Sequence, residues 1–301
     1  MTVTAPPRRQ LAPADLRRQS LSRKRRITDA VATGAIWAGL ILAVVPLALV
    51  IYYVVSRGME LMSWEFLTDR IPRQPSAEGG GIGPAVIGTL LITGAAALIA
   101  LPLGVAGAIY LNEYGKTGAL ARLIRTMADV MTGVPSIVMG LFIYVGWVLL
   151  VGERSAFAGA LALACLMLPV VIRSTEEMLK LVPDELRQAS LALGARKWKT
   201  TVSVVLPAAL SGIVSGGLLA IARAAGETAP IVLVVGTTLR PSWDLFGENT
   251  ALPALVFNNA SSVYETAQAR AWGAALTLVV IVLITTLIGR FIAARYAIKE
   301  R

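Results

Sequence analysis

Six long apolar stretches run through this chain and restrict its fold more than any other feature. The chain is 56% hydrophobic and only 15% charged, whereas soluble domains carry about 25% charged residues. A helix needs about 20 mostly apolar residues to cross the hydrocarbon core of a bilayer. The sequence therefore predicts an all-α, polytopic membrane protein with six transmembrane helices, at 30–56, 83–111, 129–151, 155–173, 206–236 and 270–292.

The distribution of basic residues predicts the orientation of these helices. Of the 28 Lys and Arg residues, 21 fall on one side of the predicted spans and 6 on the other, with Arg223 inside a span. Because basic residues accumulate in cytoplasmic segments, both termini are expected inside the cell. The polar tails 1–29 and 294–301 are then cytoplasmic, and the loop 57–82 lies outside. The net charge of +10 follows from this orientation and indicates no nucleic-acid partner. The basic tail 1–29 is expected to contact the anionic headgroups of membrane lipids.

Residue types and spacings exclude several kinds of chemistry. The chain has no histidine and a single cysteine, Cys165, which excludes a His-based metal site and an internal disulfide. The "GKT" at 115–117 lacks the glycine that a phosphate-binding P-loop requires at position 110, where Tyr110 stands. The glycines at 79–83 miss the dinucleotide-binding spacing and are expected to form a flexible entry to the second span. We expect no catalytic residue and no metal site on this chain.

The segment 174–205, expected in the cytoplasm, contains the most specific local pattern. Pro183 and Asp184 favour the start of a helix. Gly194 favours its end, because glycine readily adopts the left-handed conformation found after helix C-termini. The sequence therefore predicts a short helix across the membrane face with small side chains exposed. Such a surface suits docking into a groove on another protein, and a solvated connector is the alternative.

This loop resembles the coupling loop of ABC importer permeases, which is written E-A-A-x3-G-x9-I-x-L-P. The glycine-to-Leu-Pro spacing matches at Gly194 and Leu206-Pro207, and the E-A-A positions are occupied by Gln188-Ala189-Ser190, where Ser190 replaces the second alanine of the family. The chain departs from the family at Gln188, where the family has Glu, although Glu185 lies one turn earlier.

The resemblance implies the type I importer permease fold, with a core domain at 83–293. It also implies a separate ATPase dimer that binds ATP and Mg²⁺, so that this chain needs no cofactor. The residues that would contact this ATPase are Glu185, Gln188, Ala189, Ser190 and Gly194.

Between about residues 79 and 236, the chain resembles the A-type permease (PstA) of phosphate-specific importers. Four stretches carry this resemblance in order: "GGGIGPAVIGTLLIT", "GVPSIVMGLF", "LPVVIRSTEEMLKLVPDELRQASLALGARKWKT" and "RAAGETAPI". It implies one half of a phosphate pathway in a bacterial inner membrane, completed by a sister permease in a heterodimer. An extracytoplasmic phosphate-binding protein would deliver the substrate. The C-type sister permease shares Arg-x-x-Gly-Glu-Thr and is an alternative, as is a permease for phosphonate, sulfate or molybdate.

Two opposite charges lie within the fifth predicted span. Arg223 and Glu227 are four residues apart and so would share a helix face. An arginine at the bilayer centre costs about 2.5–3.5 kcal/mol and should face protein or water. Its guanidinium suits a tetrahedral oxyanion, and phosphate near neutral pH still has a proton to donate to Glu227, whereas sulfate has none. The Thr228 hydroxyl could donate a hydrogen bond to the substrate or bond back to its own helix. The alternative to a phosphate pathway is that Arg223 and Glu227 form a structural ion pair that holds helices together.

Five further residues are expected to shape or gate the helices. Pro135 should bend the third span, and Pro230 should kink or end the fifth just beyond the charged pair. Gly212 and Gly216 form G-x-x-x-G, which we expect to pack against a partner permease. Arg173, at the inner end of the fourth span, is expected to reach the membrane interface, with a gating role as the alternative.

Two rival interpretations come from other functional classes. A membrane-embedded enzyme acting on lipid phosphates would need a cluster of acids, His or Ser/Lys, and the acids of this chain are scattered. A secondary transporter would not need a docking helix. We therefore expect a transport subunit that performs no covalent chemistry itself.

Overall fold

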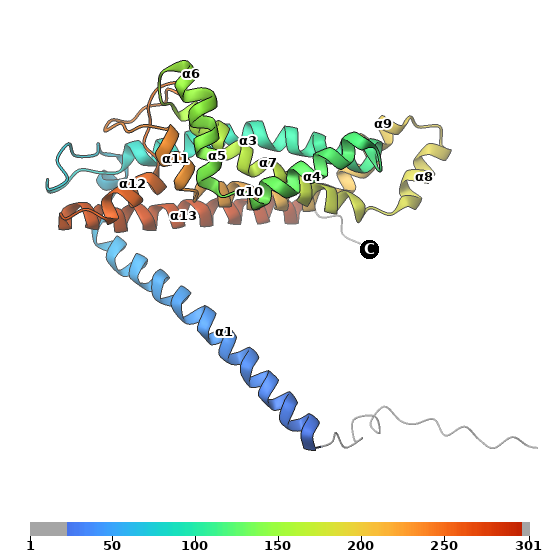
Figure 1. Cartoon of the computed structure of the whole chain (residues 1–301), viewed down its shortest axis with the longest axis horizontal. Helices are drawn as coiled ribbons and strands as arrows, with labels where there is room; N and C mark the ends of the chain where they lie inside the picture. The colour runs from blue at the N-terminus through green and yellow to red at the C-terminus, as the bar shows by residue number, and fades with distance from the viewer. Residues whose placement is uncertain (1–22, 297–301) are drawn as a thin grey trace, which may run out of the picture. The chain divides into compact units, whose positions relative to one another are not determined.

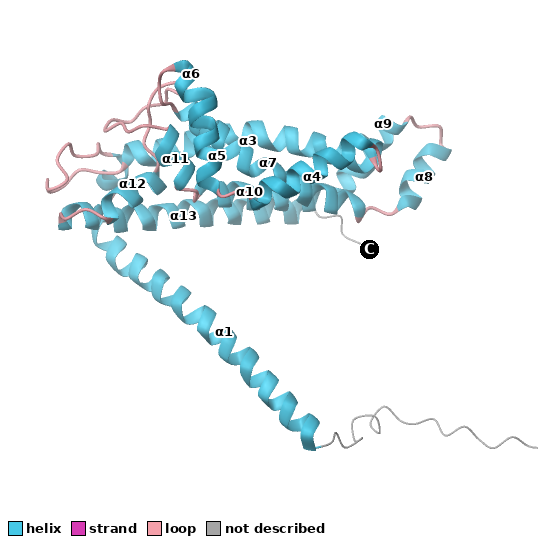
Figure 2. Cartoon of the chain, viewed as in Figure 1, coloured by secondary structure: helices cyan, strands magenta, loops and turns pink. Residues whose placement is uncertain are grey.

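The computed structural model describes residues 23–296, and every regular element in this range is helical (Figure 2). Helix α1 starts at Arg23 and helix α13 ends at Tyr296. Residues 23–29 and 294–296, expected to belong to polar tails, are thus parts of helices. The remaining tail predictions fall on 1–22 and 297–301, which lie outside the described residues.

The chain divides into two compact units, Met1–Tyr53 and Val54–Arg301. In the first unit, α1 (Arg23–Gly58) is the described element, and its side chains between 27 and 52 are exposed. Its apolar length is sufficient to cross a membrane, as predicted for 30–56.

Four long helices form the core of the second unit: α3 (Gly83–Ile109), α7 (Ala156–Lys180), α10 (Leu206–Ala225) and α13 (Glu265–Tyr296). Figure 1 shows them running side by side, with α7 packed against both α3 and α10. Alanine dominates the buried surface of this core, including Ala96, Ala100, Ala158, Ala160, Ala162 and Ala164. Small side chains let helix backbones approach closely, which is the main source of packing between helices in a bilayer.

The third predicted span is broken. Helix α4 (Ala119–Gly133) ends before Pro135, and α5 (Ser136–Ile143) continues through a π-helical turn, η4 (Tyr144–Val148), into α6 (Leu149–Val151). The two parts meet at an angle of 109°. Proline has no N–H and disfavours the helical conformation of the residue before it, and Val134 is indeed extended. The predicted bend at Pro135 is confirmed, and it is sharp enough to divide the predicted span 129–151 into two helical parts.

The fifth predicted span, 206–236, is also broken. Helix α10 ends at Ala225, and the short helix α11 (Ala229–Val234) follows after three residues. Counting the broken third span once, residues 23–296 contain six segments long and apolar enough to cross a membrane; counting only unbroken helices, they contain five.

The segment that resembles the coupling loop is largely helical. Helix α7 extends to Lys180, α8 covers Asp184–Ala192, and α9 (Lys197–Thr200) runs through a π-helical turn, η5 (Thr201–Val205), directly into α10. The predicted loop 174–205 therefore shrinks to short connections on either side of α8. Pro183 precedes α8 and Gly194 follows it with φ +82°, which confirms both predicted ends.

At the opposite end of the bundle, the loops contain three helices that the sequence did not predict: η2 (Met59–Leu61), α2 (Trp64–Thr68) and α12 (Leu252–Ala260). Of the glycines at 79–83, Gly80, Gly81 and Gly83 make close contacts, whereas Gly79 is exposed and has open space around it. Gly81 N–H donates to Arg70 O at 2.9 Å and Gly83 N–H to Asp69 O at 3.0 Å. A Cβ on Gly83 would lie 2.4 Å from Thr68 O. The prediction of a flexible entry is wrong, because the glycines allow the chain to approach its own backbone.

Candidate functional site

The break between α10 and α11 places Arg223 and Glu227 on either side of a helix end. Arg223 lies in the last turn of α10, while Glu227 follows the terminal Gly226 outside the helix. The prediction that the pair shares a continuous helix, which ends just beyond it at Pro230, is wrong. The helix ends at Ala225, and Pro230 lies in the first turn of α11, where its missing N–H costs no helical hydrogen bond.

The two charges are close but do not satisfy each other. Arg223 Nε lies 3.7 Å from Glu227 Oε1, which is too long for a hydrogen bond. The Arg223 side chain is 71% exposed and that of Glu227 20%. The guanidinium donates no hydrogen bond within residues 23–296 and keeps its donors free for another group, next to a carboxylate that can accept a hydrogen bond.

Both side chains line a cavity of about 250 Å³. Its other walls come from the α4–α5 break and from the middle of α7: Met131, Thr132, Val134, Pro135, Ser136, Leu166, Pro169 and Val170. Two interrupted helices thus border one cavity. Backbone that has lost its helical hydrogen bonds is tolerated within a membrane where it lines a cavity or is covered by protein.

Two hydroxyl groups on this wall were missed by sequence reasoning. Thr132 Oγ1 donates to Asp129 O at 2.7 Å. The Ser136 hydroxyl has no hydrogen-bond partner among residues 23–296 and stands in the first turn of α5. The sequence "GVPS" contains a signal for Ser136, because a proline that ends one helix is often followed directly by the first residue of the next. Thr228, by contrast, precedes α11 without capping it and is not among the residues that line the cavity.

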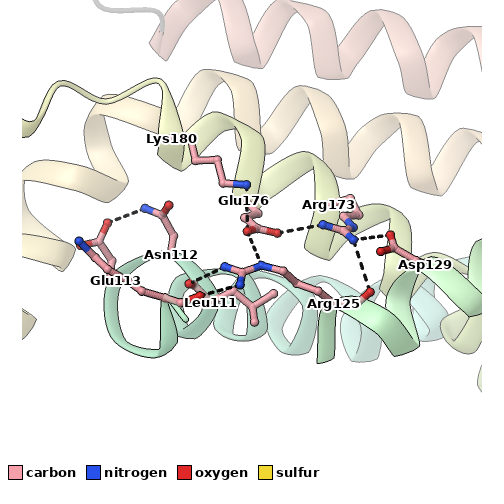
Figure 3. Close-up of polar contacts among 9 residues, drawn as sticks. Leu111, Asn112, Glu113, Arg125, Asp129, Arg173, Glu176 and Lys180 are labelled. Carbon is pink, nitrogen blue, oxygen red and sulfur yellow. Dashed lines mark hydrogen bonds and ion pairs between the residues drawn. The ribbon is translucent and has the colours of Figure 1, made fainter. Parts of the chain in front are cut away.

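Arg173 is held in an ion-pair network on the α8 side of this cavity (Figure 3). Its guanidinium pairs with Asp129 of α4 and, at 3.4 Å, with Glu176 Oε2 of α7. Glu176 is only 1% exposed and also binds Arg125 and Lys180. Arg173 is thus held by the carboxylates of two helices, and its side chain remains 30% exposed.

Helix α8 presents an exposed surface. Glu185, Gln188 and Ala189 are exposed, and α8 buries none of its side chains. Leu193, which ends α8, is 90% exposed. Ser190 is half-buried, and its hydroxyl lies 2.9 Å from Thr200 Oγ1, which ties α8 to α9. Gly194 turns the chain between these two helices.

Gly212 and Gly216 pack within the chain. A Cβ on Gly212 would lie 2.2 Å from Met178 Sδ, and one on Gly216 would lie 2.6 Å from Ser174 Oγ. Both neighbours belong to α7. The close helix approach predicted by G-x-x-x-G is confirmed, but its assignment to a partner permease is wrong, because α7 of the same chain occupies that face.

Comparison with known proteins adds independent information. Residues 100–298 match the family described as binding-protein-dependent transport system inner membrane component. The chain is 45% identical over 285 residues to the phosphate transport system permease protein PstA 1 of Mycobacterium tuberculosis (strain H37Rv), covering 91% of each chain. It is 41% identical over 246 residues to PstA of Yersinia pestis, covering 82% of this chain and 83% of that one.

Solved structures support the fold. One similar chain belongs to a bacterial alginate ABC transporter in complex with an alginate pentasaccharide-bound periplasmic protein. It has a TM-score of 0.63 and 12% identity, and the match covers 90% of this chain and 96% of that one. A chain of the inward-facing MetNI methionine ABC transporter gives a TM-score of 0.58 at 20% identity over 72% of this chain and 95% of that one. At these identities the likeness concerns the arrangement of helices alone.

Proposed function

The chain belongs to the binding-protein-dependent transport system inner membrane components, among the PstA phosphate transport permeases, and we propose that its Arg223 cavity is part of their phosphate pathway. The protein is thus a multi-pass inner-membrane subunit of a phosphate ABC importer. In this proposal it forms one half of the pathway, and a sister permease forms the other half.

The observation that carries the proposal is the cavity shared by Arg223, Glu227 and the two broken helices. Guanidinium N–H groups bind tetrahedral oxyanions through paired hydrogen bonds. The free Ser136 hydroxyl supplies a further donor on the facing wall. The Glu227 carboxylate accepts a hydrogen bond from the hydroxyl that phosphate retains near neutral pH, whereas a fully deprotonated sulfate ion would meet only repulsion from this carboxylate.

The exposed surface of α8 supports the proposed contact with an ATPase subunit. Its exposed side chains Glu185, Gln188 and Ala189 would enter a groove on that partner. ATP and Mg²⁺ would bind there, so this chain would carry no cofactor and break no covalent bond itself. The loop side of the bundle, which exposes Trp243 and Phe246, would receive the phosphate-binding protein.

Transport then follows from movement of rigid helices about the two breaks. ATP binding closes the ATPase dimer and displaces α8. The interruptions at Val134–Pro135 and at Gly226–Thr228 let α5 and α11 tilt relative to α4 and α10, and these breaks border the cavity. The cavity is thereby opened to one side of the membrane and closed to the other.

Phosphate uptake by the reconstituted importer tests this function. The complete complex is placed in vesicles with the binding protein, and uptake of radioactive phosphate is compared for the wild-type chain, Arg223→Lys and Arg223→Met. We expect Arg223→Met to abolish uptake and Arg223→Lys to retain a small part, because lysine keeps the charge but not the forked donor geometry. Full uptake by Arg223→Met in an assembled complex would show that Arg223 is not part of the phosphate pathway.

A further inference from the structure

Helix α8 is attached to the rest of the protein through polar contacts. It buries no side chain, so apolar packing does not fix its position. One attachment is the Ser190–Thr200 contact to α9. The other is Arg187, whose side chain is only 15% exposed. Any movement of α8 must therefore pass through these contacts or along the backbone.

Arg187 connects α8 to the end of α3. Its Nε and Nη2 donate to Glu113 Oε1 at 3.2 and 3.1 Å. Glu113 is 7% exposed and lies in η3 (Tyr110–Gly115), the π-helical turn that extends α3. Nη2 of Arg187 also donates to Leu179 O at 2.8 Å. A single guanidinium thus bridges α8, the end of α3 and the end of α7.

A second arginine continues the connection from η3 to α4 (Figure 3). Arg125 of α4 donates through Nη2 to Leu111 O at 3.0 Å and through Nη1 to Lys116 O at 2.6 Å. These two carbonyls flank Glu113 along the chain. Arg125 Nε also binds Glu176 Oε1 at 2.9 Å. Together with the Arg173–Asp129 pair, this contact holds α4 against α7.

Helix α4 leads from this group of contacts to the cavity. Arg125 lies in the middle of α4, and Met131 and Thr132 near its end line the cavity beside Arg223. The seven residues from Arg125 to Thr132 span about 10 Å along a helix. A displacement applied at Arg125 is therefore delivered to the cavity wall without an intervening flexible loop.

We propose that the Arg187–Glu113 bridge is the joint through which movement of α8 reaches α4 and the Arg223 cavity. This inference rests on the proposed function and names a mechanical part of it. The covalent route, from α8 through α9 into α10, reaches the opposite wall of the same cavity at Arg223. With the bridge intact, both walls move together; without it, α8 moves the α10 wall alone.

The test separates ATP hydrolysis from transport in the full importer reconstituted with its partners. Glu113→Gln keeps the shape and the acceptor oxygen but removes the charge. A charge-assisted hydrogen bond then becomes a neutral one, and a loss of about 1.4 kcal/mol corresponds to about tenfold. We expect the phosphate imported per ATP hydrolysed to fall about tenfold, while the ATPase subunit still co-purifies and ATP hydrolysis continues. Arg187→Lys, which keeps the charge but loses the forked contact, is expected to give the same uncoupling.

Glu177→Gln provides a matched control. Glu177 is an exposed carboxylate of α7 that makes no ion pair or side-chain hydrogen bond with any of residues 23–296. This variant should keep the wild-type ratio of transport to hydrolysis. An unchanged ratio in both Glu113→Gln and Arg187→Lys would refute the proposal that this bridge transmits the movement of α8. It would indicate that the movement reaches the cavity through α9 and α10 alone. A parallel fall of assembly, hydrolysis and transport in both variants would also overturn the proposal, since it would show a purely structural bridge. If the wild-type chain recruits no ATPase, the proposed function fails instead.

Discussion

Replacing Glu227 by glutamine gives the sharpest prediction about substrate choice. The change keeps the size of the side chain and removes the charge beside Arg223, which lies 3.7 Å away. The amide oxygen of glutamine still accepts a hydrogen bond from the phosphate hydroxyl, but the charge assistance of that bond is lost, which is worth about 1–1.5 kcal/mol. This corresponds to about a 5- to 10-fold rise in the phosphate concentration needed for half-maximal uptake.

Sulfate should respond in the opposite direction. A carboxylate and one unit of anionic charge about 4 Å apart repel each other by about 4 kcal/mol at an effective dielectric constant of 20. Removing the Glu227 charge removes this repulsion, so sulfate should begin to compete with phosphate in the Glu227→Gln importer.

The assay is uptake of radioactive phosphate into vesicles at neutral pH over a range of sulfate concentrations. The rate of ATP hydrolysis is measured in the same vesicles to confirm that the complex is intact. If phosphate uptake keeps its wild-type concentration dependence and sulfate still fails to compete, the Glu227 carboxylate does not select phosphate by accepting a hydrogen bond from its hydroxyl. Arg223 and Glu227 would then be a structural pair.

Three further predictions concern the cavity, the helix packing and α8. Ser136→Ala should raise the phosphate concentration for half-maximal uptake about 3- to 10-fold, the value of one neutral hydrogen bond, with ATP hydrolysis unchanged in the same vesicles. Gly88→Ala should destabilise the purified chain by about 1–3 kcal/mol, because its Cβ would lie 2.0 Å from Thr250 O. On the same helix, the Cβ of Gly94→Ala would meet no atom within 4 Å, so this variant should not destabilise the chain. Equal thermal unfolding midpoints for Gly88→Ala and Gly94→Ala would contradict the packing argument. Ala189→Arg should prevent co-purification of the ATPase without loss of folding, since Ala189 is exposed; an intact complex would exclude α8 as the docking surface.

Helix positions were predictable because the bilayer sets a length that apolar stretches must reach. The ends of α8 were also predictable, because Pro183 and Gly194 act on the backbone locally. The break at Ala225 had a readable signal that was given too little weight. Gly226 favours a helix end, and Pro230 disfavours the helical conformation of the residue before it. A continuous apolar composition across 206–236 concealed both signals.

The polar contacts could not be predicted from the sequence, since their partners are far apart along the chain. Arg187 and Glu113 are separated by 74 residues, and Arg173 and Asp129 by 44. No local pattern indicates which of many charges will meet once the helices pack. The G-x-x-x-G motif illustrates the same limit, because it predicts close helix approach but does not identify the neighbouring helix. Only the packed structure assigns Gly212 and Gly216 to α7.

The break between α4 and α5 explains how α4 can link the joint to the cavity. A continuous α4–α5 helix would satisfy its own backbone and pass the cavity as a smooth wall. The break at Val134–Pro135 instead leaves α4 as a separate rigid segment, which is bound through Arg125 in its middle and ends at the cavity. A rigid segment of this kind can move as a unit only if its attachment is strong, and four carboxylates paired with four cations surround that attachment. Weakening the joint should therefore change coupling without changing substrate preference, whereas changes at Glu227 should alter preference without changing coupling.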